Sequence, residues 1–561
     1  MKVRSAMRLA AALSLVLLWA APAAAQHAMV AAANPIATEA GLKVLRAGGS
    51  AVDAAVAIQA TLGLVEPQSS GVGGGAFMVF YDARTKHVTA YDGREFAPAG
   101  ASPALFLGAD GKPLNFFQAV LSGRSAGVPG AVAMLHLAQK EHGRLPWRDL
   151  FTDSERLADG GFLVSPRLAD YIAGREPQAQ TPDVSAYFTK ADGKKYVAGD
   201  VLKNRAYATT LRRIAAEGPA ALLTGPIAAD IVARLAKDPL PGTMTLADLA
   251  AYRPHEGPAL CRAYRRWTVC EPPAPSGGVV TLEMLGLMEH TDIAAHGPTE
   301  AEGWYLFSQV ERLAYADDLR FVADPTFVKV PVEGLLDPAY LAARAKLIGD
   351  SAGPAPESGH PAGAPADGPD ATVEPGGTSS FTVVDRWGNV VSMTTTVESV
   401  FGDGRMVDGF MLNNQLTDFS FAPNRPEGGP AANAPGPRKR PRSSMAPAIV
   451  LDRAGNFVAA VGSPGGLAIP SYVVKTLVGM FDWNLSVQDA INLPNLIALG
   501  SFYGSEPDKF APGVVAGLAA KDVKLGGRGG EGSGLHGITL RNGRLEGGAD
   551  PRREGVAKGC C

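Results

Sequence analysis

The sequence predicts an α+β layered sandwich, and three observations carry this prediction. Apolar residues recur at helical spacing over most of roughly the first 350 residues. Runs of β-branched residues joined by short glycine-containing turns follow from residue 378. Helices and strands are therefore grouped instead of alternating, which favours packed layers over a βαβ fold. With 561 residues, of which 46% are hydrophobic, the chain can bury a large core.

The first residues are typical of a secretory signal peptide. Basic residues at 2–8 precede an apolar run at 9–21 and a small-residue cleavage site at 23–25. An uncleaved membrane anchor is the alternative, but the apolar run is short for a membrane span. We therefore expect residues 1–25 to be removed and the mature protein to be periplasmic or secreted.

The net charge and the cysteines narrow the class of protein further. The net charge of −3 gives no general attraction to polyanions, so no nucleic-acid partner is expected. Cys261 and Cys270 bracket a strand-like segment. In an exported protein they can form a disulfide, and two buried thiols fit the sequence equally well.

Helices are predicted at 38–47 and 51–64, and a strand pair at 76–82 and 87–91. A glycine cluster at 71–75 lies between them. A strand follows this cluster, and a phosphate-binding loop needs a helix there, so tight backbone packing is the better explanation of the glycines.

Further helices are predicted at 131–139, 279–289 and 300–320. The next segment, 351–377, is rich in Pro, Gly and Ala and has almost no large apolar residue, so we expect it to be flexible and solvated. It is either an interdomain linker or a cleavage region. Its abrupt end at a strand that begins with Thr378 favours the cleavage region.

Two strand pairs after this segment share the same turn chemistry, with an Asp and a Gly-Asn in each turn. The first joins 379–384 to 390–397 and the second joins 446–451 to 457–462. A helix at 468–481 follows.

The junction between Gly377 and Thr378 has the features of a self-cleaving bond. A threonine hydroxyl needs a base, and no histidine lies near Thr378 in the sequence. If cleavage makes Thr378 an N-terminus, its own α-amine, with a pKa near ~8, can take and return the hydroxyl proton. The sequence therefore predicts an autocatalytic cut and a catalytic threonine at the same position.

A glycine-rich turn at 461–466 directly precedes the last predicted helix. The backbone N–H groups of Gly465 and Gly466 can point at a developing oxyanion in such a turn. An ordinary glycine turn is the alternative.

Polar clusters at 413–418 and 439–445 lie between these two features, and Arg94 lies after the first strand pair. Asp and Gln side chains can receive an ammonium group, whereas serines and an arginine can receive a carboxylate. A site that combines them suits an α-amino acid group. Each cluster taken alone is also compatible with a polar surface loop.

In this order, the motifs resemble those of the gamma-glutamyltransferases, which are N-terminal nucleophile hydrolases. The motifs are Thr-Ser-Ser-Phe-Thr-Val-Val-Asp at 378–385, Thr-Thr-Thr at 394–396, Asn-Asn-Gln at 413–415, Arg-Pro-Arg-Ser-Ser-Met at 440–445 and Gly-Ser-Pro-Gly-Gly at 462–466. The resemblance covers the chain from about residue 27 to near its C-terminus, and it implies the four-layer αββα sandwich of that superfamily.

The resemblance also implies the role of each site residue. Thr378 matches the nucleophile, Thr396 the threonine that hydrogen-bonds it, and Gly465 and Gly466 the oxyanion hole. The donor's α-carboxylate is expected at Arg94, Ser443 and Ser444. Its α-amine is expected at Gln415, Asp418 and Glu398, the last of which stands where many members carry asparagine.

Cleavage between Gly377 and Thr378 is expected to give a large chain, 26–377, and a small chain, 378–561, that remain together as a heterodimer. The resemblance implies glutathione and other γ-glutamyl compounds as donors, amino acids or dipeptides as acceptors, and no cofactor. The segment 420–437 is shorter than the lid of many members and lacks a tyrosine. This similarity to lidless bacterial members predicts an open pocket.

Two other functions compete with this interpretation. A cephalosporin or glutaryl acylase of the same superfamily is the closer one, although those relatives usually begin the small chain with serine. An exported binding protein with a proteolysed linker is the alternative from a different class.

Overall fold

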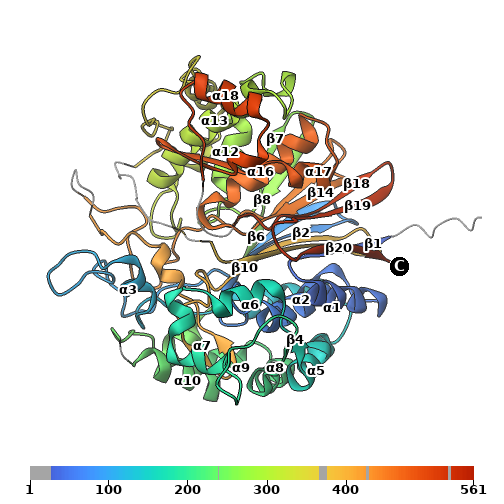
Figure 1. The fold of residues 1–561 in the computed structure, drawn as a ribbon, viewed down its shortest axis with the longest axis vertical. Coiled ribbons are helices and arrows are strands. Elements are labelled where there is room, and N and C mark those ends of the chain that lie inside the picture. Colours follow the sequence, from blue (N-terminus) through green and yellow to red (C-terminus); the bar gives the residue numbers. More distant parts are fainter. Residues whose placement is uncertain (1–26, 238, 366–373, 375, 425–428, 528–531) are drawn as a thin grey trace, which may run out of the picture.

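Two antiparallel sheets stack face to face at the centre of the molecule, with helices outside each of them (Figure 1). The computed structural model describes residues 27–237, 239–365, 374, 376–424, 429–527 and 532–561. The four-layer αββα sandwich implied by the sequence is therefore confirmed. The predicted signal peptide lies outside the described residues.

The first sheet has seven strands, and the strand that begins after Thr378 is near its middle. In spatial order they are β20 (Val556–Cys560), β1 (Ala28–Ala32), β9 (Ser379–Val384), β10 (Val390–Thr396), β2 (Gly75–Asp82), β3 (His87–Asp92) and β6 (His255–Pro258). Both chain ends thus pair beside the strand that carries the candidate nucleophile.

The second sheet has six strands. In spatial order they are β19 (Arg544–Ala549), β18 (His536–Arg541), β14 (Phe457–Gly462), β13 (Ala448–Leu451), β8 (Trp267–Glu271) and β7 (Leu260–Tyr264). β14 contacts both β9 and β10 across the sandwich, and β18 contacts β9. Apolar side chains of both sheets, among them Val79, Val390, Ile449 and Ala460, fill the space between them.

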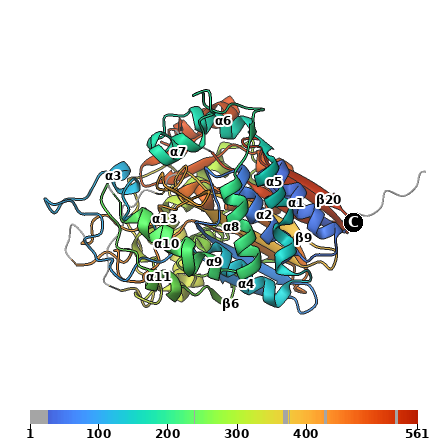
Figure 2. The same ribbon diagram turned by 90° about the horizontal axis from the view of Figure 1, so that it is seen from below.

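One helical layer covers the outer face of the seven-stranded sheet, and Figure 2 views the molecule from this side. It contains α1 (Pro35–Arg46), α2 (Ala51–Val65), α4 (Ala131–His142), α5 (Thr152–Gly160), α6 (Pro166–Ala173), α7 (Pro182–Tyr187), α8 (Arg205–Glu217), α9 (Ala220–Leu223), α10 (Gly225–Leu235) and α11 (Leu246–Ala251). α2 is buried along its whole length, and a capping box between Ser50 and Asp53 satisfies its first backbone N–H groups.

The other helical layer covers the six-stranded sheet. It contains α12 (Gly278–Met288), α13 (Ala301–Phe321), α14 (Val332–Leu335), α15 (Pro338–Ala345), α16 (Ile469–Phe481), α17 (Val487–Asn492) and α18 (Pro512–Ala520). The long apolar helices predicted before and after the second strand pair therefore share one layer.

Smaller elements complete the fold. They are α3 (Phe116–Val120), the strand pairs β4–β5 (Phe162–Leu163, Val201–Leu202) and β11–β12 (Met406–Val407, Phe410–Met411), and the three-stranded sheet of β15 (Leu496–Leu499), β16 (Phe502–Ser505) and β17 (Gly526–Gly527).

The β9–β10 hairpin sets the register at the site. Its turn is held by Asp385, whose carboxylate accepts the backbone N–H groups of Trp387 at 2.9 Å and Asn389 at 3.0 Å. The same arrangement recurs at Asp452 in the β13–β14 turn. The shared Asp–Gly–Asn pattern predicted from the sequence is thus a carboxylate-stabilised turn in both hairpins.

The first part of segment 351–377 is tethered, although its composition predicts a solvated segment. Arg312 donates to the carbonyl oxygen of Gly353 at 2.8 Å, and Arg344 donates to that of Glu357 at 3.0 Å. The backbone N–H of Gly359 reaches Asp317 at 2.6 Å. Composition misses these contacts because the partners lie in other elements, in α13 and α15, outside the segment itself. We call residues 351–360 the stem of this segment.

Cys261 and Cys270 are joined by a disulfide, which decides between the two possibilities that the sequence leaves open. They face each other across the β7–β8 pair at a Cα–Cα distance of 4.1 Å. Such a cross-link is typical of proteins that mature in an oxidising compartment. Within the part of the chain that the structure describes, no helix is long and apolar enough to cross a membrane.

Replacing Cys261 and Cys270 together by serine should lower the free energy of unfolding by roughly 2–3 kcal/mol, because the short cross-linked loop no longer restricts the unfolded chain. Denaturant unfolding of the two proteins measures the difference. A reductant should bring the wild type to the midpoint of the variant and leave the variant unchanged. Equal midpoints for the oxidised wild type and the variant would contradict the prediction.

Candidate active site

The hairpin register brings Thr378 and Thr396 together. Ser379 pairs with Thr395, so the residue before β9 lies beside the last residue of β10. The hydroxyl of Thr378 donates to the hydroxyl oxygen of Thr396 at 2.9 Å, and that oxygen also accepts the backbone N–H of Glu398 at 2.8 Å. The threonine pair is buried, and its geometry follows from the strand pairing.

The backbone of Thr378 is held on both sides. Its N–H donates to the carbonyl oxygen of Ser69 at 3.1 Å. Its carbonyl oxygen accepts a bond from the guanidinium of Arg553 at 3.0 Å. The nitrogen that cleavage would turn into an α-amine is therefore fixed within the same site as the hydroxyl.

The backbone at the Gly377–Thr378 junction is strained, and the strain lies in the φ angle of Thr378. Thr378 has φ +83°, a region that β-branched residues avoid at a cost on the order of 1–3 kcal/mol. A Cβ added at Gly377 would lie only 1.7 Å from the backbone oxygen of Glu398, so a glycine is needed there. Because φ of Thr378 is defined by the bond to Gly377, cleavage of that bond removes the constraint.

A cavity of about 20 Å³ adjoins the two threonines. Its lining residues are Arg94, Glu374, Thr378, Thr396, Glu398, Gln415, Asp418, Ser443, Ser444, Met445, Gly466 and Ile469. The structure thus brings together nine of the eleven residues that the sequence assigns to the cut and the site. Gly377 and Gly465 directly precede lining residues and do not line the cavity themselves.

Arg94 and Asp418 form a buried ion pair at 2.6 Å. Arg94 also donates to the carbonyl oxygen of Pro441 at 3.2 Å, and the amide of Gln415 donates to Asp418 at 2.6 Å. The resemblance assigns Arg94 to a carboxylate and Asp418 to an ammonium group. In the structure the two bind each other, so they form one charged wall of the cavity.

Two cavity carboxyls have raised pKa values. Burial raises the pKa of Asp418 to about 7, and Arg94 opposes this shift while the charge of Glu374 adds to it. Burial, with the nearby charge of Asp418, raises the pKa of Glu398 well above its usual range. The hydroxyl of Ser399 donates to Glu398 at 2.6 Å. A cation placed between Glu398 and Asp418 would lower both pKa values and be attracted by both groups.

Ser443 and Ser444 line the cavity from the stretch that leads to β13. The backbone N–H of Ser443 donates to the carbonyl oxygen of Pro275 at 2.8 Å. The N–H of Ser444 donates to the carboxylate of Glu374 at 3.1 Å. A carboxylate therefore already occupies the position that the resemblance assigns to the carboxylate of the donor.

Gly465 and Gly466 lie between β14 and α16. Their φ angles are +139° and +57°, so side chains are disfavoured at both positions. Gly466 begins a short 3-10 turn (Gly466–Ala468) that leads into α16. The N–H of Leu467 in this turn donates to the carbonyl oxygen of Glu374 at 3.3 Å. The turn therefore supplies a backbone donor next to the cavity-lining Gly466, and backbone donors are the chemistry that an oxyanion needs.

Sequence reasoning missed several residues at the site. They are Ser69, Glu374, Arg442, Met445, Ile469 and Arg553. Glu374 has only a weak sequence signal, because it is the last of several acidic residues in the segment before Gly377. Arg442 lies inside a cluster already noted for its polarity. Ser69 and Arg553 act through contacts between distant parts of the chain and have no local signal. Among the described residues, no cluster of three or more His, Cys, Asp or Glu side chains is placed to hold a metal ion.

Comparison with known proteins agrees with this geometry. The family model described as gamma-glutamyltranspeptidase matches residues 37–560. The chain is 36% identical to a glutathione hydrolase proenzyme of Bacillus subtilis strain 168, over 95% of this chain and 91% of the relative. It is 35% identical to the glutathione hydrolase proenzyme of Escherichia coli strain K12, with the same shares covered.

A solved structure supports the same assignment. The crystal structure of a cephalosporin acylase from Bacillus halodurans superposes with a TM-score of 0.84 and 28% identity, over 95% of this chain and 96% of that one. The order of the motifs, the fold and the extent of the family match all agree. The chain therefore belongs to the gamma-glutamyltranspeptidase family of enzymes.

Proposed function

We propose that the protein is a self-processing gamma-glutamyltransferase that cleaves γ-glutamyl amides through an ester on Thr378. The observation that carries the proposal is the buried pair of Thr378 and Thr396 hydroxyls at 2.9 Å, placed at a strained peptide bond and next to a charged cavity.

Processing begins in the uncut chain. The hydroxyl oxygen of Thr378 attacks the carbonyl carbon of Gly377, and the peptide nitrogen of Thr378 leaves with a proton. The Gly377 acyl group is then an ester on Thr378, and water hydrolyses it to a Gly377 carboxylate and a free hydroxyl. The strained φ of Thr378 favours this reaction because it is relieved when the peptide bond opens.

Turnover uses the new α-amine as the base. It takes the hydroxyl proton while the oxygen attacks the γ-carbonyl of the donor, and the proton passes to the departing amine. We assign the backbone N–H groups of Gly465 and Gly466 to the negative oxygen of the intermediate. Water or the amine of an amino acid then attacks the ester, which gives hydrolysis or transpeptidation.

The charges of the cavity suit a glutamyl head group. Glu398 and Asp418 provide a negative face for an α-ammonium, and the Ser443–Ser444 side binds a carboxylate. We therefore propose glutathione and other γ-glutamyl compounds as donors, and amino acids or dipeptides as acceptors. The working form is the heterodimer of chains 26–377 and 378–561, and no residue of the scheme calls for a cofactor.

Export is part of the proposal. The sequence pattern of residues 1–25 and the Cys261–Cys270 disulfide both suit a periplasmic or secreted protein. The curated relatives of Bacillus subtilis and Escherichia coli carry the name proenzyme, which suits a chain that is cut after folding.

A cephalosporin or glutaryl acylase is the second candidate, because the solved acylase from Bacillus halodurans has a closely similar fold. A glutaryl amide has the same terminal carboxylate as a γ-glutamyl amide and lacks only the α-amine. The acidic face at Glu398 and Asp418 has no partner in such a donor, which favours γ-glutamyl compounds.

The Thr378→Ala variant should remain a single chain, whereas the wild type separates into two chains on a denaturing gel. The small chain of the wild type should begin Thr-Ser-Ser-Phe on N-terminal sequencing. Ser380→Ala is the matched control, because it removes a buried hydroxyl of the same strand whose bond to Met393 is long, at 3.4 Å. An uncut wild type, or a cut Thr378→Ala, would refute self-processing by Thr378.

Thr396→Val should slow both processing and turnover by roughly 5- to 100-fold, because one hydrogen bond to the nucleophile and one to the N–H of Glu398 are lost. The measurements are the rate of appearance of the two chains and the kcat of the processed enzyme. Thr394→Val is the control on the same strand face, since its buried hydroxyl has no hydrogen-bond partner among the described residues. Equal effects of the two variants would contradict a specific role of Thr396.

A panel of three p-nitroanilides tests the donor class. The γ-glutamyl compound has both the α-amine and the carboxylate, the glutaryl compound lacks the amine, and the 4-aminobutyryl compound lacks the carboxylate. We expect kcat/KM for the glutaryl compound to be at least about 100-fold below that of the γ-glutamyl compound. The reason is that Glu398 and Asp418 would have no α-ammonium to bind in the glutaryl compound. Equal values for these two donors would identify an acylase instead.

A further inference from the structure

Glu374 places a carboxylate inside the candidate site four positions before Thr378. The side chain is buried, with a relative exposure of 7%. One carboxylate oxygen accepts the N–H of Ser444 at 3.1 Å, and the other lies 3.5 Å from the Nε of Arg442. The backbone oxygen of Glu374 accepts the N–H of Leu467 at 3.3 Å. Both the side chain and the backbone of this residue are thus engaged by the site.

Arg442 is fully buried behind this carboxylate. Its Nε lies 3.9 Å from Asp318 on α13, and its backbone N–H donates to Asn433 at 2.9 Å. A guanidinium held in this way has a fixed position and a second negative partner, so it remains in place when Glu374 departs. Any carboxylate that then enters would meet the same Ser444 N–H and the same positive charge.

The remaining space is too small for a donor. A cavity of about 20 Å³ holds about one water molecule, whereas a glutamyl head group has two charged groups and a three-carbon chain. A donor carboxylate therefore cannot reach the N–H of Ser444 while the Glu374 side chain accepts from it.

Given the proposed function, on which this step rests, we infer that Glu374 is a built-in ligand that fills the carboxylate subsite of the uncut chain. We infer also that Arg442 is a specificity-determining residue of that subsite, which binds the donor's carboxylate after the cut. The precursor is therefore blocked by its own segment, and cleavage at Gly377–Thr378 opens the site.

Tethering makes this block effective. A ligand that is part of the chain competes at an effective concentration of roughly millimolar or higher, without loss of translational freedom. If Glu374 occupies the subsite in more than about nine-tenths of molecules, the apparent affinity for a free glutamyl ligand falls by about 10-fold or more.

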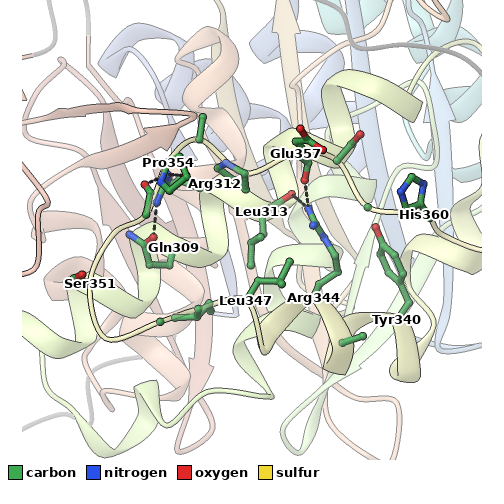
Figure 3. Close-up of a pocket in the computed structure, with 18 residues that line it drawn as sticks. Gln309, Arg312, Leu313, Tyr340, Arg344, Leu347, Ser351, Pro354, Glu357 and His360 are labelled. Atoms are coloured by element: carbon green, nitrogen blue, oxygen red, sulfur yellow. Dashed lines mark hydrogen bonds between the residues drawn. The ribbon is translucent and has the colours of Figure 1, made fainter.

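The cut changes how Glu374 is held. In the uncut chain Glu374 is linked covalently to Thr378 on one side and to the stem on the other. The stem is bound at the Arg312 and Arg344 contacts beside a cavity of about 540 Å³ (Figure 3). Cleavage removes the covalent link to Thr378, so Glu374 would then be held by the link to the stem and by its own contacts alone.

Cleavage also adds a negative charge to the segment. The new Gly377 carboxylate would form where the structure places Gly377 against the backbone of Glu398, next to a cavity that already holds the carboxyls of Glu398 and Asp418. A further negative charge beside these buried acids is unfavourable, which favours departure of the segment.

Calorimetric titration with L-glutamate tests the built-in ligand in full-length chains that cannot be cut. Thr378→Ala should bind L-glutamate at least about 10-fold more weakly than the double variant Thr378→Ala/Glu374→Ala. The matched control is Thr378→Ala/Glu357→Ala, which removes a stem carboxylate that lines the other cavity and should bind as weakly as Thr378→Ala. Equal binding by the first two proteins would overturn the inference.

Donor kinetics of the processed enzyme test Arg442. Arg442→Gln should raise KM for the γ-glutamyl anilide by about 10- to 100-fold. The conservative variant Arg442→Lys should raise it by less. Both should leave kcat/KM for the 4-aminobutyryl anilide unchanged, because that donor has no carboxylate. Equal losses with both donors would mean a merely structural role and would overturn the assignment. If either variant fails to fold, the other variant still tests the role of Arg442, and the glutamate titration still tests the built-in ligand.

The wild type separates failure of this inference from failure of the proposed function. If L-glutamate competes with the γ-glutamyl anilide in the processed wild type and the double variant still does not bind it, the built-in ligand is refuted and the proposed function stands. If the processed wild type neither cleaves the γ-glutamyl anilide nor is inhibited by L-glutamate, the proposed function fails, and Glu374 has no donor to imitate.

Discussion

The pairing of β9 with β10 is the constraint on which the site depends. It fixes the Thr378 hydroxyl against that of Thr396 without help from any flexible loop. The neighbouring strands extend this control, since β2 pairs with β10 and leads through β3 to Arg94. Across the sandwich, β14 contacts the same hairpin and ends at the glycine turn. One hairpin register therefore places Thr378, Thr396 and two walls of the cavity.

Charge balance explains why such a polar site is stable when buried. Arg94 and Arg442 lie among Glu374, Glu398 and Asp418, and each ionised group has a partner of opposite sign or a hydrogen bond. The balance is imperfect, because burial and mutual repulsion keep the pKa values of Glu398 and Asp418 high. A zwitterionic amino acid head group supplies one carboxylate to replace that of Glu374 and one ammonium for the acids. A site that is overloaded with acid in the uncut chain is thus completed by the donor.

Much of the fold could be predicted from the sequence, because it rests on local patterns. The two carboxylate-stabilised turns, the paired β-branched runs and the long apolar helices all have periodicities that act within a short window. The predicted helix at 51–64 and the observed α2 differ by a single residue at the C-terminal end. The tethered stem at 351–360 was not predictable in this way, since arginines of α13 and α15 supply its bonds.

The residues of the candidate site also fall into two groups, those with a local sequence signal and those without one. Residues within motifs, such as Thr396, Gly466 and Ser444, were predictable together because the resemblance assigns each one a role. Arg553 was not, because it reaches Thr378 from near the end of the chain, and only the fold reveals that contact. The disulfide was left open for a related reason: the spacing of Cys261 and Cys270 permits a hairpin, but only the cross-strand register shows that the two face each other.

Under the proposed function, donor choice would depend on the acidic wall more than on the carboxylate subsite. A glutaryl and a γ-glutamyl donor present the same carboxylate to Ser444 and Arg442, so those residues bind both equally. The segment 420–437 adds little, because none of its described residues lines the cavity, and Phe421 packs instead on Phe106 at 4.7 Å between ring centroids. On the proposed assignment, Glu398 and Asp418, with Gln415 beside them, would meet the α-amine in which the two donors differ. An enzyme of this fold becomes selective for amino acids by burying acids that a simple acyl donor leaves without a partner.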